Sequence, residues 1–303
     1  MSPGLSLALL SGLCLVLGDV TDRFQSIPPC LEFFYRGQPP SGFVDVSQSR
    51  LCQRLSGSLY YATLYDLSGR VPVYSAFLYK YRAEGVPRGK GVDRSWKYEV
   101  QLANNRADGN MSEITPLALR DPAVRRSQAV EGTYPLQLGG LHYVRGQLNP
   151  ANFQGSRESR SATFALTNAV PYPRSFHHHG WKPALRRVAE RLREECQGSP
   201  AYLVSGAMRQ KRGKQTWAPP RGAGRAAVPQ FLWISFCCAN GASGAMVGHC
   251  RGSGRLALRA MELGPYETQE LSVGQLEGAL AEQLGRQRIR IYKGGCTLSG
   301  SEN

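Results

Sequence analysis

The sequence lacks a second long hydrophobic run. After residue 18, no stretch reaches the roughly 18 consecutive apolar residues that a membrane-spanning helix needs, so we expect no membrane span. The one apolar run, Leu5 to Gly18, has the length of a signal-peptide core, and the small residues Val16 and Gly18 suit a cleavage site after residue 18. This predicts a signal peptide over residues 1–18 and a secreted protein. No Lys or Arg precedes the run, which leaves a short anchor or a buried helix as the alternatives.

Metal-binding cysteine pairs are absent as well. None of the 8 cysteines has CxxC spacing and only His249 neighbours one, which argues against a structural zinc site. Removal of residues 1–18 would take away Cys14. In an oxidising compartment the remaining cysteines predict two or three disulfides with at least one thiol left over, without indicating which residues pair. The triplet that begins at Asn110 (NMS) is a glycosylation sequon and suits a secreted glycoprotein.

Acidic residues are few. The chain has 22 Asp and Glu against 37 Lys and Arg, a net charge of +15, and a pI of about 9.7. Such a balance favours polyanionic partners, namely nucleic acid, heparin-like glycans or acidic membrane surfaces, and does not choose among them. The sequence does not indicate an oligomeric state.

The order of the expected elements is strands first and helices later. Residues 59–66 and 71–81 are rich in Tyr, Val and Leu and flank a turn, which predicts a β-hairpin. Residues 96–102, 162–168 and 202–206 are further strand candidates, and 228–239 has the continuous apolar character of a strand buried on both faces. Residues 103–135 are polar and interrupted, which predicts a long loop. The stretch 209–225 is basic and rich in Gly and Pro, another predicted loop.

Two amphipathic helices are expected. Residues 181–196 place Trp181, Leu185, Val188 and Leu192 on one face, and residues 273–284 repeat Leu every four positions. The sequence contains no internal repeat and no strong interdomain linker. We therefore expect one α+β domain over residues 19–303, with a mostly antiparallel central sheet flanked by helices.

Several segments together resemble the DNA/RNA non-specific endonuclease family. They are HYVRGQLNP (142–150), SATFALTNAVP (161–171), the Trp that opens the first predicted helix, FFYRGQPP (33–40), CQR (52–54), ATLYD (62–66) and KGGC (293–296). The resemblance covers roughly residues 28–297. It implies a ββα-metal active site in which one divalent ion, usually Mg²⁺, binds the scissile phosphate, a His acts as general base, and arginines stabilise charge on the phosphate.

The resemblance transfers to this chain only in part. The family's first motif reads Asp-Arg-Gly-His, and here Arg145 and Gly146 match it. Val144 replaces the Asp, and Gln147 replaces the general-base His. Asn168 matches the Asn of the family's Leu-Thr/Ser-Asn strand. Arg145, Gln147 and Asn168 are therefore the candidate catalytic residues.

Other expected roles fall on the helix and its approach. By position before Trp181, His177 replaces the family's metal-binding Asn, so it is the candidate metal ligand, and Leu185 replaces a Glu that orients the metal's waters. Arg94 aligns with a phosphate-contacting Arg. Arg186, Arg187 and Arg191 are candidate nucleic-acid contacts on the polar helix face; the alternative is a solvated face with i,i+4 ion pairs.

The residue at position 147 determines how much catalytic activity the sequence predicts. A primary amide can hydrogen-bond a water but cannot accept its proton near pH 7, and loss of a general base costs roughly 10²–10⁴ in rate. His177, His178 or His179 could supply a metal ligand or a base; three adjacent histidines are more often a solvated run. Trp217, in the basic loop, could offer a stacking surface.

Three functions remain open at this point. The first is a secreted, metal-dependent, non-specific DNA/RNA endonuclease with a degenerate motif and reduced activity. The second is a catalytically silent relative that binds nucleic acid or another polyanion through the same basic surface. The third is an extracellular protein-interaction factor that uses the scaffold only for its shape.

Overall fold

A computed structural model describes residues 19–43, 47–79, 91–130, 137–138, 141–209, 216–218, 225–252, 255–258 and 261–296. The predicted signal peptide lies outside these ranges, as does most of the predicted basic loop at 209–225. Within them, no helix combines the length and hydrophobicity needed to cross a bilayer.

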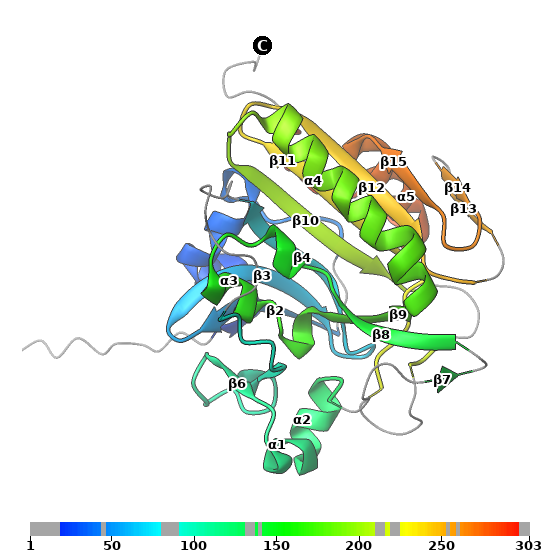
Figure 1. The fold of residues 1–303 in the computed structure, drawn as a ribbon. Coiled ribbons are helices and arrows are strands. Elements are labelled where there is room, and N and C mark those ends of the chain that lie inside the picture. The colour runs from blue at the N-terminus through cyan, green and yellow to red at the C-terminus, as the bar shows by residue number, and fades with distance from the viewer. Residues whose placement is uncertain are drawn as a thin grey trace, which may run out of the picture.

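An eight-stranded antiparallel sheet forms the centre of the fold (Figure 1). In spatial order its strands are β1 (Val20–Thr21), β2 (Gln48–Leu55), β3 (Ser58–Asp66), β4 (Val71–Tyr79), β10 (Ala201–Met208), β11 (Phe231–Cys238), β12 (Ser243–His249) and β15 (Thr268–Leu271). Every neighbouring pair is antiparallel. The α+β class with a mostly antiparallel sheet is confirmed.

The strands form where Tyr, Val and Leu recur between turns. β3 and β4 pair as the predicted hairpin, and the turn at 67–70 places Arg70 in the left-handed region at φ 51°. Every residue of β11 is buried, as its unbroken apolar run predicts.

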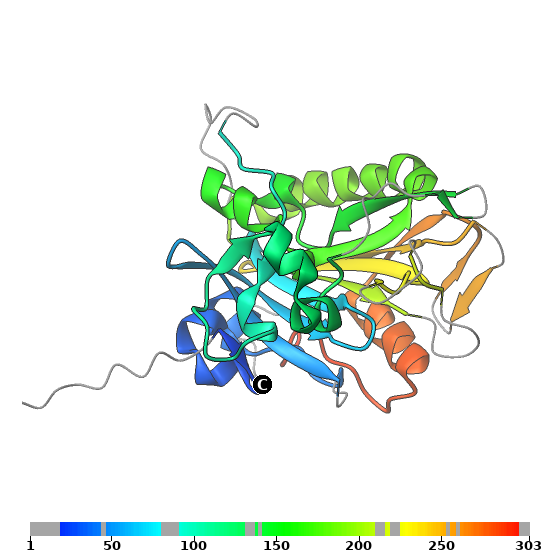
Figure 2. The same ribbon diagram turned by 90° about the horizontal axis from the view of Figure 1, so that it is seen from below.

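One long helix covers each face of the sheet (Figure 2). α4 (Lys182–Cys196) buries Ala184, Val188, Leu192 and Cys196, one residue per turn. α5 (Val273–Leu284) begins with a capping box between Ser272 and Gln275. Both helices were predicted. We call the face covered by α4 the site face and the face that carries α5 the reverse face.

Two local predictions are wrong. Residues 162–168 form no strand: α3 (Arg157–Ala162) ends there and a 3-10 turn follows at Leu166–Asn168, because Ser156 and Ser159 make a capping box that starts a helix. The expected loop at 103–135 contains β6 (Met111–Glu113), α1 (Pro116–Arg120) and α2 (Pro122–Ser127). Thr115 and Asp121 cap these helices, each followed by a Pro at the first helical position.

Smaller elements complete the fold. The predicted strand at 96–102 is shorter, because β5 (Lys97–Glu99) gives way to a 3-10 turn at Val100–Leu102. The remaining strands are β7 (Gln137–Leu138), β8 (Leu141–Gln147), β9 (Ala169–Pro173), β13 (Leu256–Leu258) and β14 (Met261–Leu263). Further 3-10 turns lie at Phe24–Ser26, Pro28–Phe33, Tyr35–Gly37 and Ala151–Phe153.

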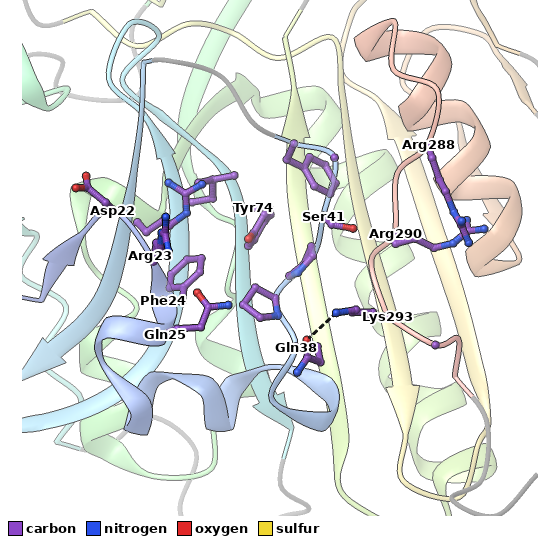
Figure 3. A pocket seen from close by; sticks show the side chains of 17 residues that line it. Asp22, Arg23, Phe24, Gln25, Gln38, Ser41, Tyr74, Arg288, Arg290 and Lys293 are labelled. Carbon is purple, nitrogen blue, oxygen red and sulfur yellow. Dashed lines mark hydrogen bonds between the residues drawn. The ribbon is translucent and has the colours of Figure 1, made fainter. Parts of the chain in front are cut away.

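Segments from both ends of the chain meet on the reverse face (Figure 3). Ser41 and Arg290 exchange two backbone hydrogen bonds, of 2.8 and 3.1 Å. Gly42, at φ 91°, lies so close to this crossing that a Cβ atom would stand 2.5 Å from the carbonyl oxygen of Arg288. Only glycine suits this position.

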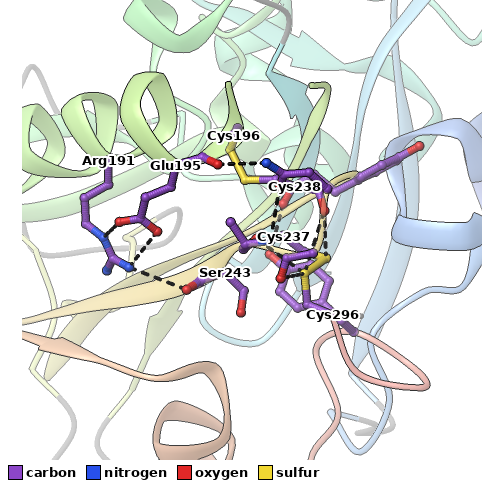
Figure 4. Close-up of a disulfide and its surroundings, with 12 residues drawn as sticks. Arg191, Glu195, Cys196, Cys237, Cys238, Ser243 and Cys296 are labelled. Atoms are coloured by element: carbon purple, nitrogen blue, oxygen red, sulfur yellow. Dashed lines mark hydrogen bonds and ion pairs between the residues drawn. A yellow bond between two sulfur atoms is a disulfide. The ribbon is translucent and has the colours of Figure 1, made fainter. Parts of the chain in front are cut away.

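Three disulfides link the described residues: Cys30–Cys52, Cys196–Cys238 and Cys237–Cys296. Cys237 and Cys238 are adjacent at the end of β11, and successive strand residues point to opposite faces (Figure 4). Cys238 is therefore joined to α4 and Cys237 to the C-terminal segment. Cys250 is buried and free, the leftover thiol that the cysteine count predicts.

Candidate active site

The segment that carries the RGQ motif folds as two strands and a helix on the site face (Figure 1). β8 and β9 are antiparallel, with Gly146 opposite Val170. The chain then passes through a π-helical turn, Phe176–Trp181, directly into α4. This is the strand–strand–helix order expected of a ββα unit.

Asn168 holds this unit to the central sheet. It is completely buried, and its side chain makes four hydrogen bonds. The amide oxygen accepts from Ser75 Oγ (3.1 Å) and Asn149 N (2.8 Å), while the amide nitrogen donates to the carbonyls of Asn149 (3.0 Å) and Thr163 (2.9 Å). All hydrogen-bonding positions of the amide are thereby used. The geometry gives Asn168 a positioning role beneath the RGQ segment.

Tyr172 connects the RGQ motif to His177. Its ring lies against Gly146, where a Cβ atom would stand 2.1 Å from three of the ring and hydroxyl atoms, so the glycine makes room for the ring. The Tyr172 hydroxyl lies 3.4 Å from His177 Nδ1, and the two rings stack 5.9 Å apart. Burial, together with the nearby His178 and Lys182, lowers the pKa of His177 and so favours its neutral imidazole. A neutral imidazole can act as a metal ligand.

Gln147 is held at both ends of its amide. Nε2 donates to Thr163 Oγ1 at 2.9 Å, and Oε1 accepts from the backbone N–H of Ala151 at 3.4 Å. Thr163 Oγ1 in turn donates to the carbonyl of Arg160 at 2.7 Å. The side chain thus stabilises the loop between β8 and α3, and it offers no group that takes up a proton.

Arg145 lies two residues before Gln147, so both side chains leave β8 on the same face. The guanidinium carbon of Arg145 lies 4.8 Å from the centre of the Trp96 ring, a cation–π contact between two half-buried side chains. Trp96 also meets Phe164 edge to face at 5.6 Å. A cation beside an aromatic surface can bind a phosphate and a base together.

The candidate arginines of α4 differ in their surroundings: two form ion pairs and one is exposed. Arg187 donates to Thr268 Oγ1 at 2.9 Å and pairs with Glu270 at 3.6 Å. Arg191 pairs with Glu195 at 2.5 Å and with Glu270 at 3.6 Å, and these carboxylates raise its pKa. Both guanidinium groups are thereby turned toward β15 and its carboxylate. Arg186 is exposed, and so is Arg94, before β5.

The donors around His177 do not match the preferences of Mg²⁺. Val144 and Leu185, at the two positions where the family has acidic residues, pack against the core of the site face. Among the residues the structure describes, no three His, Cys, Asp or Glu side chains come together as a metal site. Mg²⁺ prefers carboxylate oxygens and water, whereas this site offers an imidazole and a phenol. His178 and His179 are exposed.

Sequence reasoning missed the residues that connect the site. Trp96, Thr163 and Tyr172 each contact a predicted site residue, yet none belongs to a recognisable charged motif. A signal was present for Tyr172, since a glycine within a strand often marks the close approach of another group. Trp96 and Thr163 give no such signal, because their contacts depend on chain segments far apart in sequence.

Comparison with known proteins gives a consistent picture. Residues 44–282 match the family described as DNA/RNA non-specific endonuclease. The endonuclease domain-containing 1 protein of Homo sapiens is 33% identical over 214 residues, covering 69% of this chain and 39% of its own length. The protein of the same name from Mus musculus is 33% identical over 215 residues, covering 69% and 38%. The chain therefore spans less than two-fifths of the length of these relatives.

One solved structure, from a study of how EndoG is inhibited, is that of the EndoG/EndoGI complex, and it contains a chain similar to this one. It matches with a TM-score of 0.41 and 18% identity, covering 74% of this chain and 80% of that one.

Proposed function

This chain belongs to the DNA/RNA non-specific endonuclease family, and we propose that it binds DNA or RNA at the β8–β9–α4 unit and hydrolyses phosphodiester bonds slowly. The observation that carries the proposal is the placement of Arg145 and Gln147 on one face of β8, beside Trp96. The unit keeps groups that bind phosphate and has an amide where a base is expected.

Each residue has a definable part in this reaction. Arg145 stabilises negative charge on the phosphate, and Trp96 offers a face for an adjacent base. Gln147 can hydrogen-bond the attacking water without deprotonating it, so the proton leaves to solvent. Asn168 and Tyr172 hold the strands that present these groups. The missing base is the reason for the slow rate, lowered by roughly 10²–10⁴.

A divalent ion is implied by the resemblance to metal-dependent nucleases. Such an ion would stabilise charge on the leaving oxygen. Of the candidate residues, His177 is the one whose neutral imidazole suits a cation. The described residues around His177 lack the carboxylates that Mg²⁺ prefers, so the cleavage assay tests whether an ion is required.

We further propose that the mature protein is secreted. The apolar run at residues 5–18 and the three disulfides support an oxidising compartment, and the sequon at Asn110 is consistent with it. The net charge of +15 suits a polyanionic partner in that compartment.

A second function is a catalytically silent nucleic-acid-binding or polyanion-binding protein. The observation that favours it is the Gln147 amide, whose nitrogen and oxygen already contact Thr163 and Ala151. A side chain engaged in this way holds a loop rather than a water molecule. In that case binding remains and hydrolysis is absent.

Cleavage and binding assays on Arg145→Ala test the proposal. Mature protein is incubated with plasmid DNA and with RNA in EDTA, Mg²⁺, Mn²⁺ or Ca²⁺. We expect slow cleavage that Arg145→Ala abolishes and the control Arg255→Ala leaves unchanged, since Arg255 is exposed and forms an ion pair with the surface residue Glu262. Activity that persists in EDTA would show that no ion is required.

Binding separates the two functions. Affinity for DNA should fall steeply as salt rises, because phosphate contacts release counterions. Salt-sensitive binding without cleavage under any condition would favour the silent protein. If DNA and RNA are neither bound at low salt nor cut, both functions are excluded.

A further inference from the structure

A second basic site lies on the reverse face of the sheet. A pocket of about 680 Å³ is lined by residues from both ends of the chain and by the strands between them (Figure 3). Its volume falls in the range that small-molecule ligands occupy and is too small for a double helix. The backbone crossing between Ser41 and Arg290 and the disulfide Cys30–Cys52 fix its walls, so the pocket is preformed.

The pocket and the candidate active site are on opposite sides of the sheet. In β4, Tyr74 lines the pocket, while the next residue, Ser75, donates a hydrogen bond to Asn168. In β3, Leu64 lines the pocket, while Thr63 bonds to Ser75. Because successive strand residues point to opposite faces, the sheet itself separates the two sites.

The charges of the pocket are unbalanced. Arg23, Arg50 and Arg288 line it, and their guanidinium groups make no hydrogen bond or ion pair within the described residues. Two other cations on its wall are engaged: Arg290 pairs with Glu277 at 2.6 Å and Lys293 donates to Gln38 at 3.3 Å. Among the described residues that line the pocket, one is acidic, Asp22.

Three uncommitted guanidinium groups around one cavity favour a compact, multiply charged anion. The guanidinium plane matches phosphate oxygens in a bidentate manner, which makes arginine the usual residue for phosphate recognition. Phe24 and Tyr74, whose side chains are almost completely buried, also line the pocket and make part of its surface apolar. A ligand with a phosphate at one end and a flat ring at the other uses both features.

We propose that this pocket binds a nucleoside phosphomonoester, either as a free mononucleotide or as the phosphorylated end of a single strand. The phosphate part of the assignment depends on the pocket alone. The nucleoside part rests on the proposed function, since a nuclease generates such ends. The site is a binding site, and no bond is made or broken in it.

Calorimetric titration of the mature protein with 5′-AMP and with adenosine tests the phosphate. We expect 5′-AMP to bind and adenosine to bind at least tenfold more weakly. Arg23→Gln combined with Arg288→Gln should weaken 5′-AMP binding by about tenfold or more, because charge-assisted hydrogen bonds are lost. Both arginines are exposed, so the pair should fold normally. The control pair Arg120→Gln with Arg255→Gln, also exposed, removes equal charge elsewhere and should change affinity less than twofold.

A second pair of ligands shows whether the bound phosphate belongs to a free nucleotide or to the end of a strand. A 5′-phosphorylated tetrathymidylate that binds more tightly than 5′-TMP assigns a strand end, and equal affinity assigns a free nucleotide. Equal binding of 5′-AMP and adenosine, or equal loss in the control pair, overturns the proposal. A heparin-derived oligosaccharide that binds the pocket while both nucleotides fail overturns the nucleoside assignment.

The pocket proposal and the proposed function can be disproved independently of each other. If 5′-AMP does not bind although wild-type protein cuts or binds DNA, the pocket proposal is wrong and the proposed function stands. If 5′-AMP binds and Arg23→Gln with Arg288→Gln abolishes that binding, but DNA and RNA are neither bound nor cut, only the proposed function is wrong.

Discussion

The arginines near the two candidate sites, one on each face of the central sheet, differ in whether they have partners within the chain. On the site face, Arg187 and Arg191 contact carboxylates of the same chain, and Arg145 stacks on Trp96. On the reverse face, Arg23 and Arg288 line a pocket without a partner among the described residues. A net charge of +15 therefore says little about where an anion binds. What matters is which cations have no internal partner.

Two buried carboxylates differ in the opposite sense: the one on the reverse face has more of its hydrogen bonds satisfied than the one on the site face. On the reverse face, Glu277 accepts from Arg290 and from the backbone N–H of Ile291, so both its oxygens are satisfied. Glu99 lies near Tyr61 on the site face; it is fully buried, and its Oε1 has no hydrogen-bond partner among the residues that the structure describes. The site face thus contains polar groups whose surroundings do not match them, a pattern that is common where function has shaped a site.

The largest expected effect is the gain of a base. Gln147→His should raise the rate of plasmid cleavage by roughly 10²–10⁴, because imidazole can accept the proton that the amide cannot. Thr163 Oγ1, already 2.9 Å from the Gln147 nitrogen, can orient the new ring. Gel assays of plasmid nicking measure the change. Gln154→His, in a buried position nearby, is the matched control and should give no gain. An inert Gln147→His protein that still binds DNA would show that more than the base has been lost.

The next effect concerns the residue that joins the site face to the sheet. Asn168→Ala should lower the free energy of unfolding by about 3–4 kcal/mol, since it leaves several buried partners of the amide unsatisfied. Urea unfolding followed by circular dichroism measures it. Asn104→Ala, at an exposed position, should cost less than about 0.5 kcal/mol. Binding of 5′-AMP on the reverse face should survive at low temperature, where the variant is folded.

The smallest effect is a pH dependence of stability. Burial, and secondly the carboxylate of Asp19, raises the pKa of Glu99 to about 8. A carboxyl group with a raised pKa in the folded state stabilises it fully below the unfolded value near 4.5, and this contribution is lost as pH rises toward 8. Stability of the wild type should thus fall more between pH 5 and pH 8 than that of Glu99→Gln, by an amount on the order of 1–3 kcal/mol.

Glu277→Gln provides the comparison on the reverse face. It removes a charged partner of Arg290 and should destabilise the protein at pH 5 and pH 8 alike. Unfolding by urea at the two pH values measures both variants. Parallel pH profiles for wild type and Glu99→Gln would mean that Glu99 does not titrate in this range.

Sequence reasoning predicted what local patterns encode. The β3–β4 hairpin, the buried strand β11 and both long helices follow from residue type and periodicity, and each is confirmed. Residues 162–168 were mispredicted because their apolar character outweighed the capping signal at Ser156. α1 and α2 were missed, although Thr115 and Asp121 are ordinary helix caps.

The sequence indicated the site only through residues that match or replace those of the family's motifs. The RGQ motif and the helix after it identified Arg145, Gln147 and His177, and the structure places them on one strand–strand–helix unit. The partners that define their chemistry are Trp96, Thr163 and Tyr172, and tertiary packing brings them there. The ion pairs of Arg187 and Arg191 with Glu270 likewise depend on the meeting of α4 with β15. The pocket on the reverse face required the crossing of residues 41 and 290.

The adjacent cysteines at the end of β11 have a mechanical consequence. Cys237–Cys296 closes a covalent loop that contains β12, β15 and α5, and Cys196–Cys238 fastens the same strand end to α4. A pulling force applied beyond residue 296 would pass through the sulfur bridge directly into β11 and bypass the loop. The reverse-face helix would then carry no load until the bridge is reduced.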